Sequence, residues 1–129
     1  MNSNPHQEDI LELCNVIRQT SFQIHSFLRN GHRERIYENA LVHRLRKQGI
    51  KVVQQPEIRV FDEDGTVLGY LKADLLVETQ LICEIKGAGS IVDEHIAQLL
   101  GYLRASRLEH GLLINFGAPR LQIRKLILQ

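Results

Sequence analysis

The hydrophobic periodicity of the chain changes near Gly49, and this change constrains the fold more than any other feature. Before Gly49, apolar residues recur about every 3.6 residues over 8–28 and over about 33–48, a period typical of amphipathic helices. Beyond Gly49, stretches rich in Val and Ile alternate with turn residues such as the DEDG at 62–65, and this pattern favours strands. The sequence therefore predicts two helices followed by a sheet.

The predicted strands come in two groups. Three follow the helices directly, at 51–61, 67–77 and 81–86. Pro56 makes the first an edge strand, and the pair Thr79-Gln80 predicts a tight hairpin between the second and third. A third helix is expected at about 92–106, followed by strands at 111–116 and 121–128. The order α-α-β-β-β-α-β-β predicts one α/β domain over residues 1–129, an ordinary domain length.

Composition narrows the class of protein. With 43% hydrophobic residues and a formal net charge of +1, the chain has enough apolar material for a core and is not a generally basic nucleic-acid binder. Basic residues do gather locally, at Arg29, Arg33 and Arg35 and again over 101–129. Such clusters could contact phosphates, and a solvated helix face is the plainer interpretation. Cys14 and Cys83 are expected to be reduced thiols.

The cellular location that we expect rests on two features that the sequence does not show, a signal peptide and a membrane-spanning segment. The first residues, MNSNPHQED, are polar and acidic, unlike a signal peptide. No apolar run approaches the roughly 20 residues that a membrane-spanning helix needs. We therefore expect a cytoplasmic protein with no membrane partner.

The residues most suggestive of chemistry are Asp74 and, ten residues later, Glu84-Ile85-Lys86. Strand side chains alternate between faces, so Glu84 and Lys86 point one way while Cys83 and Ile85 point into the core. If the second and third strands form a hairpin, Asp74, near the middle of one, lies beside Glu84 on the other. Two carboxylates and an ammonium group would then share one spot on an apolar sheet, which is costly unless something compensates.

A divalent cation would remove this cost. Mg²⁺ is commonly held by one or two carboxylates together with water and substrate phosphate. A cation there could lower the pKa of bound water and stabilise charge on a phosphate, while Lys86 orients the water or offsets negative charge in the transition state. The alternative is an ordinary charged patch in which Glu84 and Lys86 form a surface pair, and spacing alone leaves both interpretations open.

Two further sets of polar residues lie on predicted helices. Gln98 and Tyr102 are four residues apart and so share a face, with His95 near Gln98. Glu34 and Glu38 are one turn apart on the second helix, and either could supply another carboxylate. The plainer alternatives are a surface glutamine and a glutamate that favours the N-terminal helix dipole.

Several segments together resemble the GxxExxY protein family, which is part of the PD-(D/E)xK nuclease-like superfamily. They are GHRERIY at 31–37 with Glu38, Ala40 and Leu41, KADLLVE at 72–78, CEIKG at 83–87, HIAQLLGYLRAS at 95–106 and GLLINFGAPRLQIRKL at 111–126. The resemblance runs from about Ile10 onward and holds in order and spacing. Two departures are Arg29-Asn30-Gly31, where the family has Gly-Pro-Gly, and Lys72, where it has Arg.

The resemblance implies a restriction-endonuclease-like core, with a central mixed sheet of about four to five strands flanked by helices. By matching positions, Asp74, Glu84 and Lys86 would be the catalytic Asp, Glu and Lys. Asp74, Glu84 and the Ile85 carbonyl would hold Mg²⁺ or Mn²⁺, and Glu34 would complete the site through a metal-bound water.

Other matches to the family are less defined. Glu38 is the alternative to Glu34 as the helix-borne acid. Gln98 and Tyr102 are similar to the Q-x-x-x-Y motif of exonuclease-type members and would support the substrate or Lys86. His25 and Asn115 also match family positions without an assigned role.

The resemblance thus implies a metal-dependent nuclease that hydrolyses phosphodiester bonds of nucleic acid, with DNA favoured over RNA. The alternative is a non-catalytic module on the same fold that binds nucleic acid or protein, and an enzyme acting on another phosphate ester is a third option. The small size and near-neutral charge fit a homodimer or a protein partner that supplies substrate affinity. No Gly-rich phosphate loop, serine or cysteine nucleophile arrangement, or zinc spacing is present in the sequence.

Overall fold

A computed structural model describes residues 5–129. Its helices are α1 (Pro5–Leu28), α2 (Glu34–Lys47) and α3 (Asp93–Ser106). Its strands are β1 (Val52–Gln54), β2 (Glu57–Phe61), β3 (Val67–Lys72), β4 (Leu75–Val77), β5 (Leu81–Lys86), β6 (His110–Asn115) and β7 (Gln122–Ile127). No helix in this part of the chain is both long and apolar enough to cross a membrane.

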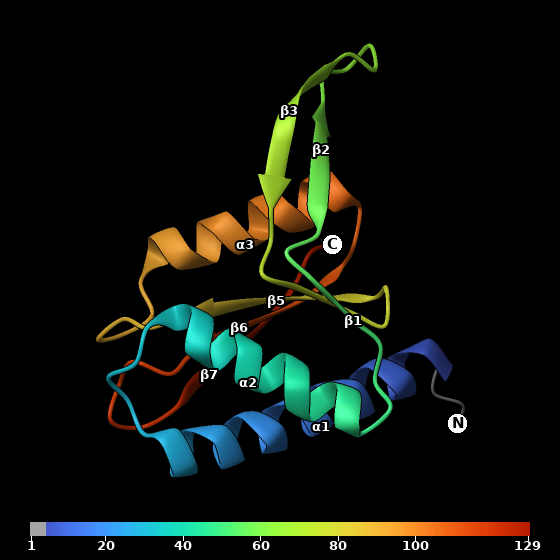
Figure 1. The fold of residues 1–129 in the computed structure, drawn as a ribbon. Coiled ribbons are helices and arrows are strands. Elements are labelled where there is room, and N and C mark those ends of the chain that lie inside the picture. Colours follow the sequence, from blue (N-terminus) through green and yellow to red (C-terminus); the bar gives the residue numbers. More distant parts are fainter. Residues whose placement is uncertain (1–4) are drawn as a thin grey trace.

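Five strands form a central mixed sheet in the order β1-β4-β5-β6-β7, with β5 and β6 parallel and the other pairs antiparallel. Helices α1 and α2 cover one face and α3 covers the other (Figure 1). Cys83 and Ile85 belong to the core under α1 and α2, and Ile82 belongs to the core under α3. The predicted α/β fold with a mixed sheet and flanking helices is therefore confirmed, as is the alternation of β5 that turns Glu84 toward α3.

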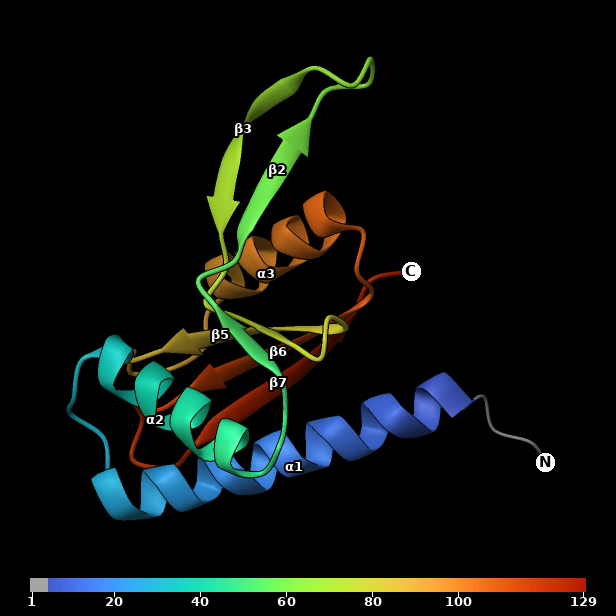
Figure 2. The same ribbon diagram turned by 45° about the vertical axis from the view of Figure 1, so that its right-hand side comes forward.

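Two predicted strands are each divided in the structure. The stretch 51–61 becomes β1 and β2, separated at Gln55 and Pro56, and the stretch 67–77 becomes β3 and β4, separated at Ala73 and Asp74. Gln55 has a φ of 55°, a left-handed conformation that redirects the chain. As a result β1 and β4 stay in the central sheet, while β2 and β3 form a separate two-stranded arm that stands off beyond α3 (Figures 1 and 2).

The connection between β4 and β5 also differs from the prediction. Val77 pairs with Leu81, so the turn has three residues, Glu78 to Gln80, where two were expected. Glu78 and Thr79 both have positive φ, 52° and 59°. Glu78 is held by Lys51, because its amide donates to the Lys51 carbonyl at 2.8 Å while its carboxylate accepts from the Lys51 amide at 2.6 Å. This contact with the β1 side, which sequence spacing does not reveal, stabilises the longer turn.

Tyr37 fixes the start of α2, which carries both candidate helix acids. Its ring is fully buried and stacks on Phe116, with centroids 4.7 Å apart and planes 4° from parallel. Its hydroxyl donates to the Arg29 carbonyl at 2.5 Å and accepts from the His32 amide at 3.0 Å. The loop before α2 is therefore held close to the end of β6, near the carboxyl end of β5.

Candidate functional site

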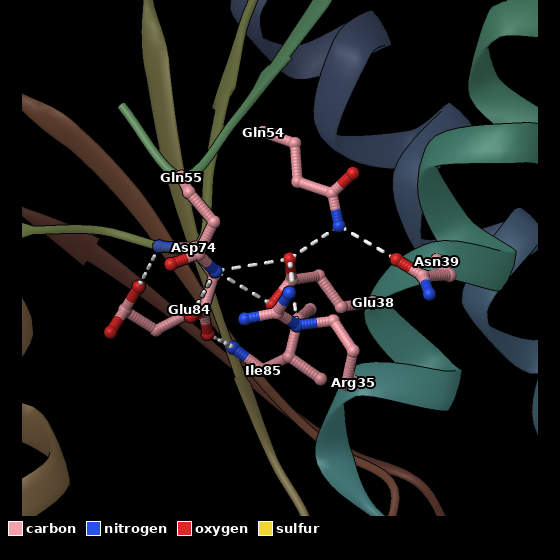
Figure 3. Close-up of polar contacts among 8 residues, drawn as sticks. All are labelled: Arg35, Glu38, Asn39, Gln54, Gln55, Asp74, Glu84 and Ile85. Carbon is pink, nitrogen blue, oxygen red and sulfur yellow. Dashed lines mark hydrogen bonds and ion pairs between the residues drawn. The ribbon is translucent and has the colours of Figure 1, made fainter. Parts of the chain in front are cut away.

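Asp74 and Glu84 lie together where β3 passes into β4. Asp74 occupies a bend just before β4, and not the middle of a strand as the sequence suggested. Its backbone amide donates to Glu84 Oε2 at 2.6 Å, and its own Oδ2 accepts from the Ile85 amide at 2.7 Å (Figure 3). These reciprocal bonds fix both carboxylates against the backbone of the neighbouring segment.

The environment of this pair opposes two negative charges. Glu84 is only 3% exposed, and burial, with a further contribution from the charge on Asp74, raises its pKa to about 8. Burial also raises the pKa of Asp74, although the hydrogen bond from the Ile85 amide acts in the opposite direction. Two carboxyl groups that are hard to ionise together form a site that a cation would stabilise.

A third acid, Glu38, lies on the α2 side of this pair. Its carboxylate is buried, with 3% exposure, and accepts from Gln54 Nε2 at 2.6 Å and from Gln55 Nε2 at 3.0 and 3.1 Å. Arg35 forms an ion pair with it at 3.7 Å. Gln55 Nε2 also lies 3.5 Å from Asp74 Oδ1, so one amide group links the two acids (Figure 3).

Glu34 occupies a different position from Glu38. It is exposed at the start of α2, and its Oε2 accepts from the Gly87 amide at 2.9 Å, just beyond the end of β5. The charge of Glu38 contributes to raising the pKa of both Asp74 and Glu84, whereas Glu34 contributes only at Asp74. Both acids thus border the site, and Glu38 is the more deeply embedded.

Gln54 and Gln55 are site residues that sequence reasoning did not single out. Two adjacent glutamines directly before Pro56, at the end of a Val-rich strand, were the available signal. Side chains in such a place usually face solvent, whereas here both amides reach Glu38 on α2, Gln54 from the end of β1 and Gln55 from the turn that follows. Gln55 is tied to the site by its backbone as well, because its amide donates to the Asp74 carbonyl at 2.7 Å.

Lys86 is connected to α3 by a chain of polar groups. Its Nζ donates to Gln98 Oε1 at 2.7 Å, and Gln98 Nε2 donates to the Tyr102 hydroxyl at 3.1 Å. Burial, with the charges of Glu84 and Asp74, raises the pKa of Tyr102, so its hydroxyl stays protonated. The structure thus brings Gln98 and Tyr102 together with Lys86, on the face of the sheet that also carries Glu84.

Asn115 and His25 support the backbone near the site. Asn115 is fully buried, and its side chain bonds both the amide and the carbonyl of Ala88 at 3.0 Å, which anchors the loop after β5. His25 Nε2 lies 3.0 Å from the Ala118 carbonyl. Gly117 belongs to the same support, because a Cβ there would lie 2.3 Å from the Gly87 carbonyl carbon.

The donor set fits a hard cation. Within residues 5–129 no group of three or more His, Cys, Asp or Glu side chains is arranged to hold a metal. Two carboxylates and a backbone carbonyl, from Asp74, Glu84 and Ile85, are nevertheless the kind of oxygen set that Mg²⁺ uses when it keeps several waters. The raised pKa of Glu84 supports this fit, because burial and the charge of Asp74 raise it and a bound cation would offset both effects.

Comparison with solved structures places the fold. The protein SSO0001 matches with a TM-score of 0.60 and 22% identity over 71% of this chain and 48% of its own. The alkaline exonuclease LHK-Exo of Laribacter hongkongensis matches with a TM-score of 0.50 and 14% identity over 68% and 52%. This chain therefore spans about half the length of each, and at these identities the likeness shows a shared fold.

Sequence comparison reaches further along the chain. No curated protein matches. The model of the PD-(D/E)XK nuclease superfamily, whose members typically depend on a metal, matches residues 11–126. That span includes the acids around Asp74 and the central sheet except for the last residue of β7. With this match and the restriction-endonuclease-like fold, the chain belongs to the PD-(D/E)XK nuclease superfamily.

Proposed function

We propose that this chain is a metal-dependent nuclease that hydrolyses phosphodiester bonds of nucleic acid, with DNA as the favoured substrate, and that it is a member of the GxxExxY family. The observation that carries the proposal is the pair of half-buried Asp74 and buried Glu84, which shares its face of the sheet with Lys86. Membership of a nuclease superfamily implies a nucleic-acid substrate. The GxxExxY assignment adds the match of 31–37 and the later segments.

Asp74, Glu84 and the Ile85 carbonyl would hold Mg²⁺ or Mn²⁺. When bound, the cation would activate water and stabilise charge on the phosphate. Asp74 and Glu84 are ready for this role because backbone amides already fix one oxygen of each carboxylate. Glu34 would act through a metal-bound water, and Glu38 is the alternative.

Lys86 would orient the attacking water or offset charge on the phosphate. Its ammonium group is held at 2.7 Å by Gln98, an amide that cannot take its proton. The Lys86 ammonium, which can only donate, selects the amide oxygen, and the other end of the Gln98 amide donates to the Tyr102 hydroxyl. Gln98 and Tyr102 therefore serve to hold the ammonium group in place.

The second candidate is a non-catalytic binding module on the same fold. The net charge of +1 favours it, because a nuclease without an extended basic surface binds its substrate weakly alone. The low net charge is equally compatible with a catalytic protein if a homodimer or a protein partner adds substrate affinity.

Metal titration with parallel cleavage assays separates these functions. Mn²⁺ and Mg²⁺ are titrated by calorimetry into the wild type, Asp74→Ala/Glu84→Ala and Lys86→Ala, and each protein is incubated with end-labelled single- and double-stranded DNA and RNA. Lys47→Ala, an exposed lysine at the far end of α2, is the matched control for Lys86→Ala.

The nuclease function predicts a specific pattern of metal binding and cleavage among these variants. Metal binding is lost in the double carboxylate variant and kept in Lys86→Ala, while cleavage is lost in both and kept in Lys47→Ala. Metal binding without cleavage of any substrate would favour the binding module. A wild type that binds neither metal would refute the metal-dependent mechanism.

A further inference from the structure

The outer face of the two-stranded arm formed by β2 and β3 is left uncovered by the rest of residues 5–129. Its strands pair antiparallel with Arg59 opposite Tyr70 and Glu57 opposite Lys72, and the arm stands away from the central sheet beyond α3 (Figure 2). From the chemistry of that face we infer that the base of the arm binds single-stranded nucleic acid and leads it to the site. The inference rests on the proposed function in one respect, namely that the bound single-stranded nucleic acid is the substrate of the site.

The two faces of the arm differ in burial. Ile58 is 8% exposed and, with Leu71, packs into the core that also contains α3 residues. Side chains alternate along each strand, so the residues between these point outward. Arg59, Tyr70 and Lys72 are all exposed, and Tyr70 is 58% exposed. One face is thus fixed to the body and the other is free for a ligand.

The outer face combines an aromatic ring with two cations and one acid, because exposed Glu57 lies opposite Lys72 on the same face and leaves a net positive charge there. An exposed tyrosine offers a surface on which a base can stack, and neighbouring cations can contact the phosphates on either side of that base. Within residues 5–129 the ion pair found is that of Arg35 with Glu38, and neither Arg59 nor Lys72 forms one. Stacking requires an unpaired base, and the face therefore fits a single strand better than a duplex.

The chain itself links this face to the site. Lys72 is the last residue of β3, and Asp74 follows it after one residue. The two segments are also joined across the base of the arm, where the Ala73 amide donates to the Pro56 carbonyl at 3.3 Å. A strand bound across Tyr70 and Lys72 would thus reach the acids without crossing any other element.

The tip of the arm carries the opposite charge. Asp62, Glu63 and Asp64 lie in the turn between β2 and β3 and would repel phosphates. This confines the proposed contact to the base of the arm. The tip also bears exposed Phe61 and Leu68, and an apolar protein partner there is the competing occupant that the experiment must address.

Binding is measured without cleavage, by fluorescence anisotropy in EDTA, with a labelled dT oligonucleotide, the same length of duplex and a U-rich RNA. Variants are Tyr70→Ala, Tyr70→Trp and the pair Arg59→Gln/Lys72→Gln. The control pair Lys47→Gln/Arg124→Gln removes two exposed cations from α2 and β7. All these positions are exposed, and thermal unfolding checks that each variant folds.

We expect Tyr70→Ala to weaken single-strand binding by roughly ten-fold, and Tyr70→Trp to restore it, because one base loses or regains its stacking partner. Arg59→Gln/Lys72→Gln should lower the slope of log affinity against log salt by about 1.4, since two phosphate contacts are lost. The control pair should change neither quantity to this extent, and duplex binding should respond less to Tyr70→Ala.

The inference is overturned if folded Tyr70→Ala binds the oligonucleotide as the wild type does, or if the wild type does not bind it. An equal loss of duplex binding in Tyr70→Ala would overturn the preference for a single strand. A further variant, Leu68→Ala, tests the apolar tip: loss of self-association with unchanged nucleic-acid binding would assign the arm to a protein contact. Because EDTA removes the cation, these outcomes do not depend on whether the chain cleaves. The nuclease proposal can therefore fail while the arm still binds nucleic acid, and the arm can fail to bind while the chain still cleaves.

Discussion

Replacing Glu84 by glutamine should remove much of the pH dependence of folding. Burial raises the Glu84 pKa from its ordinary 4.5 to about 8 in the folded protein. Between these values the folded protein holds a proton that the unfolded chain has released. Unfolding then releases a proton, so the free energy of unfolding falls as pH rises through this window. Glutamine has no proton to lose, and its amide oxygen can still accept from the Asp74 amide.

The magnitude follows from the linkage between proton binding and stability. A single proton changes the free energy of unfolding by about 1.4 kcal/mol per pH unit. Carried over the whole window from 4.5 to about 8, this gives an upper limit of roughly 5 kcal/mol. Relaxation around the Asp74–Glu84 pair reduces this limit, and we expect Glu84→Gln to be more stable than the wild type at pH 9 by about 2–3 kcal/mol.

Urea unfolding in EDTA, followed by circular dichroism from pH 5 to pH 9, measures this difference. Glu94→Gln makes the same change of charge at the exposed start of α3 and is the control. Asp74→Asn should also flatten the wild-type curve, because it removes the charge that helps to raise the Glu84 pKa. If wild type and Glu84→Gln lose stability in parallel as pH rises, Glu84 is ionised in the folded protein and the argument for an uncompensated acid pair is wrong.

Three further changes test the support of the site. Gln55→Ala should weaken Mn²⁺ binding by about ten-fold, measured by calorimetry, because the amide linking Glu38 to Asp74 is lost, and unchanged affinity would contradict this. Asn115→Ala should lower the free energy of unfolding by about 2–4 kcal/mol in urea, since buried backbone groups lose their partners, and a loss under 1 kcal/mol would contradict it. Gly117→Ala should lower the free energy of unfolding by at least ~3 kcal/mol, measured by thermal unfolding, because its Cβ would lie 2.3 Å from backbone. Gly101→Ala, which has open space in α3, should not destabilise the protein, and similar losses in the two variants would refute the contact argument.

The helices could be predicted from the sequence because their information is local. The apolar residues of α1 at Ile10, Cys14, Ile17 and Ile24 lie on one buried face, and a period of 3.6 residues reveals such a face without knowledge of its partner. The strand β5 was equally clear, since its apolar residues are continuous up to Glu84. In each case the burial pattern along one segment is enough to specify the element.

The breaks in the strands could not be predicted in the same way. The run from Val67 to Val77 carries only a weak mark of its interruption, Lys-Ala-Asp at 72–74, which are residues that strands disfavour, and the apolar residues on both sides favour strands. What divides it is the packing of Leu71 and Ile58 into the core with α3, which draws β2 and β3 away from the central sheet. That contact joins residues far apart in the sequence, so periodicity within one segment cannot detect it.

The same break places the candidate site. In an unbroken strand the Asp74 backbone amide would pair with a carbonyl of the next strand, as ladder amides do. At the bend this amide instead donates to the Glu84 carboxylate, and the freed Ile85 amide binds Asp74 in return. The sequence could predict that the two acids lie near each other, because ten residues and a turn bring them to neighbouring strands. It could not predict that both are anchored by backbone amides, and this anchoring depends on the arm being held by α3.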